Sequence, residues 1–341
     1  MTDAQVVGAT AAEARPGDAG GDFDALTATV ARLQQAIETV IEGKSEVIRT
    51  TLTVLFAGGH LLLEDVPGVG KTMLSKTLAR AIDGSVRRIQ FTPDLLPSDV
   101  TGVSIFNQDT RTFEFRPGGV FANIVVGDEI NRSSPKTQSA LLECMEERQV
   151  TVDNATYHLD DPFMVIATQN PIEMEGTYPL PEAQRDRFMA RVSMGYPVPS
   201  AELAMLDSRA TTNPLDALEP VTDAAQIAAL ITVVNSVFVS DAVKRYAVAL
   251  VTATRNSPDL RLGASPRATL HLIRAARAFA ALEGREFVLP DDVQTLAKPV
   301  LVHRLLPGIE AQIGGRDVDA IVDDVVRTVA MPQRRGVETS A

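Results

Sequence analysis

The segment "LLLEDVPGVGKTML", at residues 61–74, constrains the fold of this 341-residue chain more than any other feature. A leucine-rich strand runs into a Gly/Pro turn, and the turn runs into the start of a helix. In a loop of this kind, backbone N–H groups and the N-terminus of the following helix surround phosphate groups. Lys71 can then reach the β- and γ-phosphates of a nucleotide, and the Thr72 hydroxyl can ligate Mg²⁺. The segment therefore predicts a nucleotide-binding domain.

One position of this loop departs from the strict pattern G-x-x-x-x-G-K-[ST], because Asp65 stands where that pattern has its first glycine. The position is at the exit of the strand, where a turn is needed, and Asp tolerates turn conformations. We therefore expect Asp65 to serve the turn and an Asp65→Gly variant to keep its activity. The residues expected to surround the nucleotide phosphates are Pro67, Gly68, Val69, Gly70, Lys71, Thr72 and Met73. The alternative, a strand-to-helix turn that happens to precede Lys-Thr, predicts no catalytic partners downstream.

Two later strands end in polar residues that suit nucleotide hydrolysis. The run "NIVVGDEI" (123–130) carries Asp128, which can hold Mg²⁺ through its water shell, and Glu129, which can polarise the attacking water. The run "FMVIATQN" (163–170) ends in Asn170, whose amide can hold a water against the γ-phosphate. Open α/β sheets bind ligands at this carboxyl edge. Solvated turns or helix caps are the alternative for each group alone, but the spacing behind the Lys-Thr loop favours an ATPase site.

The pattern of apolar runs divides the chain into four parts. Short β-type runs alternate with helical stretches in the first half, which predicts a parallel sheet covered by helices. These runs lie at 60–64, 86–91, 122–129, 163–170 and 190–194. Two further segments, 102–119 and 148–163, each predict a β-hairpin inserted into this core. We expect a disordered acidic tail (1–25), an α/β nucleotide-binding domain (26–197), an α-helical domain (198–332) and a flexible C-terminus (333–341).

Composition narrows the possible partners and compartments. The net charge is -12, and no lysine or arginine run is present, so nucleic acid is not expected as the main partner. The single cysteine, Cys144, excludes an internal disulfide and fits a reducing compartment. No apolar run is long enough to span a membrane, and the N-terminus lacks the order of a signal peptide, so we expect a cytoplasmic protein. The four histidines show no metal-ligand spacing, and nucleotide-bound Mg²⁺ is the only metal predicted.

Longer stretches of the chain resemble the MoxR family of AAA+ ATPases, from about residue 26 to 330. They are "LLLEDVPGVGKTML", "QFTPDLLPSDVTGVSIFNQ", "EFRPGGVFANIVVGDEINRSSPKTQSALLECMEERQVTV", "FMVIATQNPIEMEGTYPLPEAQRDRF" and "GASPRATL". The resemblance implies an α/β fold, with an AAA+ P-loop NTPase core whose parallel sheet is sandwiched by helices and carries β-hairpin insertions. A smaller all-α lid domain should follow. Many members carry "EDVPG" in the loop, which implies that Asp65 is tolerated.

The resemblance also implies roles for single residues. It assigns Walker A to Lys71 and Thr72, Walker B to Asp128 and Glu129, and sensor 1 to Asn170. In "DRF", Arg187 is implied as the arginine finger that enters a neighbouring subunit's site, and Arg185 is a second candidate.

In "GASPRATL", Ser265 and Pro266 suit an N-cap and a first helical residue, which places Arg267 in the first turn. In relatives the arginine at this position is sensor 2, the residue that contacts the γ-phosphate, and the resemblance implies the same role for Arg267. The segment "VIEGKSEVI" (40–48) holds the position where relatives contact adenine around Ile41 and Gly43.

These features together predict an enzyme that binds ATP with Mg²⁺ and hydrolyses it to ADP and phosphate at the subunit interfaces of a homo-oligomeric ring, a hexamer. The resemblance implies that the ring remodels or matures client proteins, and relatives often work with von Willebrand factor A domain proteins. Three alternatives stay open: a magnesium-chelatase-like motor subunit, a nucleotide-gated binding module with negligible hydrolysis, and a nucleic-acid motor.

Overall fold

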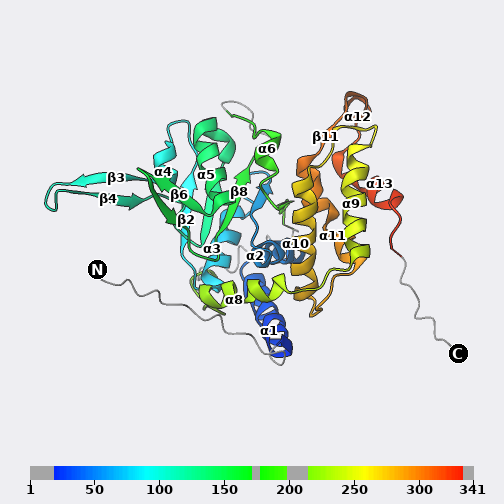
Figure 1. Cartoon of the computed structure of the whole chain (residues 1–341), viewed down its shortest axis with the longest axis horizontal. Coiled ribbons are helices and arrows are strands. Elements are labelled where there is room, and N and C mark those ends of the chain that lie inside the picture. Colours follow the sequence, from blue (N-terminus) through cyan, green and yellow to red (C-terminus); the bar gives the residue numbers. More distant parts are fainter. Residues whose placement is uncertain (1–18, 171–176, 198–213, 333–341) are drawn as a thin grey trace, which may run out of the picture.

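The computed structural model describes residues 19–170, 177–197 and 214–332, and Figure 1 shows the arrangement of their helices and strands. Helix α1 (Ala19–Glu38) begins within the stretch expected to be a disordered tail. Phe23 is only 8% exposed and belongs to the same core cluster as Leu26. Helix α1 therefore includes residues 19–25 of the predicted tail, and burial of the Phe23 ring stabilises its first turns. The rest of the predicted tail and the predicted C-terminus lie outside the described residues.

Five parallel strands form the central sheet, in the spatial order β2-β5-β8-β1-β9. Their bounds are β1 Leu61–Glu64, β2 Val86–Gln90, β5 Ile124–Asp128, β8 Met164–Gln169 and β9 Ala190–Val192. The central strands β1, β5 and β8 are buried along nearly their whole length, as their apolar runs predict. Strands β8 and β1 lie next to each other although about a hundred residues separate them in sequence. The predicted α/β fold is confirmed.

Side chains that alternate along β1 show that helices cover both faces of the sheet. Leu61 and Leu63 belong to a cluster that includes residues of α1, α2 and α3, whereas Leu62 belongs to a second cluster with residues of α4 and α5. The bounds are α2 Ser45–Phe56, α3 Lys71–Ala81, α4 Pro97–Thr101 and α5 Pro135–Glu147. Two short helices also belong to this half, the 3-10 helix η1 Ile130–Arg132 and α6 Glu182–Arg185.

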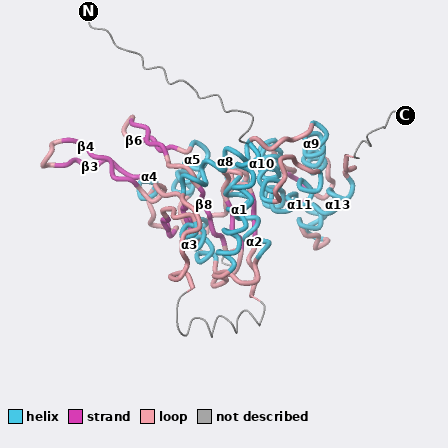
Figure 2. Tube along the Cα trace, turned by 90° about the horizontal axis from the view of Figure 1, so that it is seen from below, coloured by secondary structure: helices cyan, strands magenta, loops and turns pink. Residues whose placement is uncertain are grey.

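Both predicted hairpins are present. Strands β3 (Gly102–Asn107) and β4 (Thr112–Pro117) pair antiparallel and project from the body of the molecule in Figures 1 and 2. Strands β6 (Gln149–Val152) and β7 (Ala155–His158) form the second hairpin. The two hairpins meet where the rings of Phe115 and Tyr157 stack with centroids 3.8 Å apart.

The C-terminal half is mainly helical, as predicted, but it also contains a small antiparallel sheet. Its elements are α8 Ala224–Asn235, α9 Asp241–Arg255, β10 Leu260–Leu262, α10 Pro266–Leu282, α11 Pro290–Leu301, η2 Val302–Arg304, β11 Leu306–Pro307, α12 Ile309–Ile313 and α13 Val318–Thr328. Strands β10 and β11 are too short to produce an alternating pattern, so the sequence did not reveal them.

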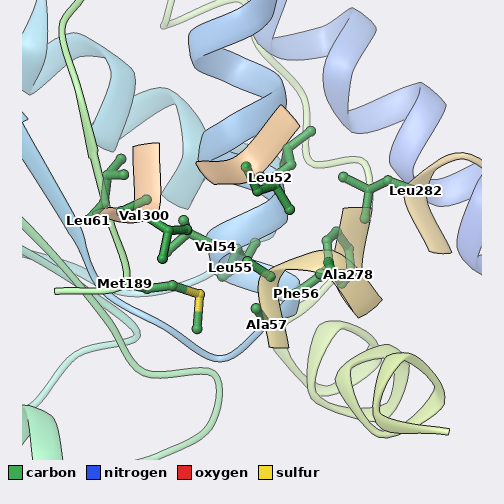
Figure 3. Close-up of a cluster of buried hydrophobic side chains, with 14 of the residues drawn as sticks. Leu52, Val54, Leu55, Phe56, Ala57, Leu61, Met189, Ala278, Leu282 and Val300 are labelled. Carbon is green, nitrogen blue, oxygen red and sulfur yellow. The ribbon is translucent and has the colours of Figure 1, made fainter. Parts of the chain in front are cut away.

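The helical half and the sheet half share one hydrophobic core. Figure 3 shows residues of α2, β1, α10 and α11 in contact around Leu55, Phe56, Leu61 and Ala278. Helix α8 also packs against α1, α2 and α10, and the backbone N–H of Val221 donates to the carbonyl that ends α3 (2.8 Å). The lid domain is therefore held directly against the α/β domain. Within the described residues, no helix is long and apolar enough to cross a membrane.

Candidate nucleotide site

The phosphate loop, residues 65–70, connects β1 to the N-terminus of α3. Gly68 and Gly70 both adopt left-handed backbone conformations, with φ +85° and +94°, and Gly70 is the N-cap of α3. Only glycine adopts such angles without strain, so the loop's path depends on both residues. Pro67 and Gly68 are exposed, whereas Val69 and Met73 pack against the core. The Lys71 ammonium donates to the Asp65 carbonyl (2.7 Å), and this bond holds the positive charge of Lys71 next to the loop.

Asp65 does more than the sequence indicates. Its carboxylate accepts hydrogen bonds from the N–H of Val66 (2.8 Å), the Ser193 hydroxyl (2.8 Å) and the N–H of Gly195 (2.6 Å). Burial acts to raise the Asp65 pKa, but these bonds outweigh it and lower that pKa below its usual value. The carboxylate thus ties the phosphate loop to the segment that follows β9. This is a different contribution from the turn-forming one that we expected.

The carboxyl ends of β5 and β8 bring the predicted catalytic acids beside the loop. The Thr168 hydroxyl donates to Asp128 Oδ1 (2.5 Å) and accepts from the Glu129 N–H (3.0 Å), so one side chain holds the Asp128 carboxylate and the Glu129 backbone. Glu129 has φ +56°, a left-handed conformation that is uncommon outside glycine and that concentrates at functional sites. Thr168 was not among the residues predicted from the sequence, although a threonine inside an otherwise apolar run is a signal that could have identified it.

Side chains from β2 and η1 contact the same two acids. Arg88 donates to Asp128 Oδ2 through Nε (3.1 Å) and Nη2 (2.6 Å). Gln90 donates to Glu129 Oε2 (3.1 Å), and Arg132 pairs with the same oxygen (3.1 Å). The donor set formed by the Thr72 hydroxyl and the Asp128 carboxylate consists of hard oxygen atoms and fits Mg²⁺. A cation at Asp128 would compete with Arg88 for that carboxylate.

Asn170 and the expected adenine-contacting turn also lie next to the loop. The Asp65 N–H donates to the carbonyl of Gln169 (3.1 Å), so the buried Asn170, 6% exposed, follows directly beside the loop. Ile41 is buried and Gly43 has φ +71°.

Lys44, which follows that turn, donates to the carbonyls of Gly195 (3.4 Å) and Tyr196 (3.0 Å). Since Asp65 binds the Gly195 N–H, the same short segment joins the adenine turn to the phosphate loop. The sequence-predicted loop, acids, amide and adenine turn therefore meet at one edge of the sheet.

The two remaining predicted residues, Arg187 and Arg267, lie at the opposite edge. Both line a pocket that includes His60, the residue before β1, whereas the phosphate loop follows β1. His60 and Asp65 are five residues apart, which is about 16 Å at the rise of a parallel strand. The implied contact between Arg267 and a γ-phosphate therefore cannot be made to the chain's own loop.

A single carboxylate holds these two arginines together. Arg187 pairs with Glu146 Oε2 (3.0 Å) and donates to the Leu142 carbonyl (2.5 Å), and Arg267 pairs with Glu146 Oε1. Arg185 instead makes a long ion pair with Glu182 (4.0 Å) and does not line the pocket. The geometry thus favours Arg187 over Arg185 as the arginine that acts together with Arg267.

Asp186 joins the segment that carries Arg187 to the helix that carries Arg267. The buried Arg304, 3% exposed, donates to Asp186 Oδ1 (2.8 Å), and the Ser265 hydroxyl donates to Asp186 Oδ2 (2.7 Å). Ser265 is the N-cap of α10 and Pro266 is its first residue, as predicted, but the hydroxyl makes this interdomain bond in place of a capping bond. No role was predicted for Asp186 from the sequence, because its partner is an arginine 118 residues later in the chain.

Comparison with known proteins gives consistent matches. Residues 60–190 match the model of the ATPase family associated with various cellular activities (AAA), and residues 252–325 match that of the AAA lid domain. The uncharacterized protein YeaC of Bacillus subtilis is 51% identical over 299 residues, covering 88% of this chain and 93% of that protein. The chaperone MoxR1 of Mycobacterium tuberculosis is 41% identical over 337 residues, covering 95% and 88%.

The fold also matches a solved structure over nearly its whole length. A crystal structure from Cytophaga hutchinsonii, described as that of a candidate ATPase, superposes with a TM-score of 0.87 at 38% sequence identity. The match covers 93% of this chain and 98% of that one.

Proposed function

Because this chain belongs to the MoxR family of AAA+ ATPases, we propose that it hydrolyses ATP at the interfaces of a homo-oligomeric ring. One observation carries this proposal: Arg187 and Arg267 lie together at the sheet edge opposite the phosphate loop. Each chain then supplies the phosphate loop of one ATP site and the arginines of the next site in the ring. A ring of equivalent contacts, with a hexamer as the proposed size, would join every loop to a neighbour's arginines.

Within one chain, the loop edge binds ATP and prepares the water. Backbone N–H groups after Gly68 and at the start of α3 surround the phosphates, and Lys71 adds a positive charge. Thr72 and Asp128 would hold Mg²⁺, which neutralises charge on the β- and γ-phosphates when bound. Glu129 takes a proton from the attacking water, and Asn170 orients that water.

The neighbouring chain supplies the remaining positive charge. Arg187 would stabilise the charge that develops on the transferring phosphoryl group, and Arg267 would contact the same group. In the isolated chain both guanidinium groups share Glu146, so binding a neighbour's triphosphate exchanges one anionic partner for another.

The energy of ATP hydrolysis is used, in this proposal, to remodel client proteins, in agreement with the chaperone name of the relative MoxR1. The projecting β3–β4 hairpin supports this assignment, because it exposes Phe106 (48%) and Phe113 (73%) to solvent. Exposed apolar patches of this kind are typical of protein-binding surfaces. A protein with a von Willebrand factor A domain is the proposed partner class.

A complementation experiment tests the shared sites. Lys71→Ala should lose ATP binding, whereas Arg187→Ala should bind ATP but release no phosphate. When the two variants are mixed, an interface that joins the intact loop of one to the intact arginines of the other should recover activity. Normal phosphate release by Arg187→Ala, or no recovery in the mixture, would contradict the proposal. An ATP-dependent assembly of the wild type with no phosphate release would identify a nucleotide-gated binding module instead.

A further inference from the structure

The pocket that contains Arg187 and Arg267 holds two more arginines. It has a volume of about 310 Å³, and Arg148 and Arg274 line it together with Glu146, His60 and His271. Arg148 follows α5 and Arg274 lies on α10, so the four arginines come from both domains. Neither Arg148 nor Arg274 has a place in the site described above.

Arg148 and Arg274 converge on one backbone oxygen. The Gly58 carbonyl accepts from Arg148 Nη2 (2.9 Å) and from Arg274 Nη2 (3.0 Å), and Arg274 also donates to the Ala57 carbonyl (2.7 Å). Gly58 has φ +60°, and a Cβ there would lie 2.9 Å from Arg148 Nη2. The close approach of the two guanidinium groups therefore depends on glycine at this position.

Positive charge is in excess around this pocket. The pocket lining includes four guanidinium groups, those of Arg148, Arg187, Arg267 and Arg274, and one carboxylate, that of Glu146. Outside the lining, Asp161 pairs with Arg148, and Asp186 pairs with Arg267 and Arg304. Among the residues that the structure describes, no carboxylate lies within ion-pair distance of Arg274. Burial and, next, the charge of Arg148 lower the pKa of Arg274.

The neighbouring imidazole of His60 does not add to this positive charge. His60 is buried, and its pKa is lowered to about 4, first by burial and partly by Arg148 and Arg274. It is therefore neutral at pH 7. Like charges brought together in a partly buried pocket destabilise the isolated chain unless an anion joins them, and sites of this kind are commonly functional.

We propose that Arg148 is a third arginine that contacts the triphosphate bound by the neighbouring subunit, and that Arg274 positions Arg148 through the Gly58 carbonyl. The inference depends on the proposed ring, because Arg148 lies at the same sheet edge as Arg187 and Arg267 and cannot reach its own phosphate loop. Arg148 Nη1 pairs with the exposed Asp161 (2.8 Å) and Nη2 donates to the Gly58 carbonyl, and the side chain lines the pocket together with Arg187 and Arg267. A triphosphate carries enough negative charge to neutralise the excess, whereas a single carboxylate does not.

The experiment compares Arg148→Ala and Arg148→Lys with the wild type and with a matched control, Arg327→Ala, whose side chain is 74% exposed on α13. We expect Arg148→Ala to keep the wild-type affinity for ATP in the monomer and to lower phosphate release per subunit by about tenfold or more. The rate of phosphate release by Arg148→Lys should lie between those of the wild type and Arg148→Ala, because lysine keeps the positive charge but lacks the forked guanidinium. Mixing Arg148→Ala with Lys71→Ala should restore phosphate release.

Arg274→Gln tests the positioning role, because its loss of activity should be smaller than that of Arg148→Ala and should disappear in the Arg148→Ala background. Thermal melting confirms that each variant is folded. Phosphate release at the wild-type rate by Arg148→Ala overturns the inference and leaves the proposed function intact. So does a loss that Lys71→Ala cannot rescue, because it places Arg148 in its own chain's site. A wild type that neither assembles nor hydrolyses ATP overturns the proposed function, and the inference falls with it.

Discussion

Replacing Asp65 with glycine restores the strict loop pattern, yet the structure predicts that it destabilises the protein. The change removes the carboxylate that accepts from the Ser193 hydroxyl and the Gly195 N–H, at 2.8 and 2.6 Å. A hydrogen bond to a charged group contributes about 1.5–3 kcal/mol, and two such bonds therefore contribute up to about 6 kcal/mol. Water can replace part of this, because the partners are not fully buried. We expect the free energy of unfolding to fall by about 2–4 kcal/mol.

Urea denaturation measures this loss, and Asp153→Gly is its matched control. Asp153 sits in the turn between β6 and β7 with φ +49°, where glycine relieves strain and should change stability by less than about 1 kcal/mol. Asp65 has no such positive φ, so glycine brings no compensating gain there. The pKa of Asp65 is lowered, so its contribution should be fully present above pH 4 and disappear as the pH falls below that. If Asp65→Gly is as stable as Asp153→Gly, the carboxylate does not anchor the loop.

Three further predictions follow from the same geometry. Gly70→Val should abolish ATP binding in a fluorescent-nucleotide titration, because valine is strained at φ +94°; retained binding would show that the loop path is not fixed by glycine. Glu129→Gln should bind ATP but lower phosphate release by about a hundredfold or more, and normal turnover would exclude this carboxylate as the base. The free energy of unfolding should decrease by about 2 kcal/mol from His60 alone as the pH falls from 7 to 5. The reason is that His60 binds a proton below about pH 6.5 in the unfolded chain but only below about pH 4 in the folded chain. His271 and His303, whose pKa values burial also lowers, add to this decrease, and a flat profile would contradict this prediction.

The parts of the molecule that could be predicted from sequence are those that depend on contiguous residues. Strand, loop and helix follow one another between Leu61 and Ala81, and the glycines at 68 and 70 show where the backbone bends. The carboxyl ends of parallel strands meet at one edge, so Asp128 could be placed beside the loop without knowing the strand order.

The parts that could not be predicted depend on contacts between distant segments. In the sequence, Arg148 is an ordinary basic residue after a helix. Its place in the arginine-lined pocket becomes visible only through its bond to Gly58, 90 residues earlier. Glu146 similarly acquires its importance from Arg187 and Arg267, which come from different domains. The bonds of Asp65 to residues near 194 also span more than a hundred positions, so a local pattern suggested only a turn.

The shared core of the two domains determines what can move during an ATP cycle. Rotation of the lid against its own sheet would expose Leu55, Phe56 and Ala278 to water, and each fully buried large side chain contributes roughly 1.5–3 kcal/mol. It would also break the buried pair of Arg304 and Asp186. We therefore expect each subunit to behave as one mechanical body, so that nucleotide turnover tilts whole subunits against their neighbours and the ring itself serves as the hinge.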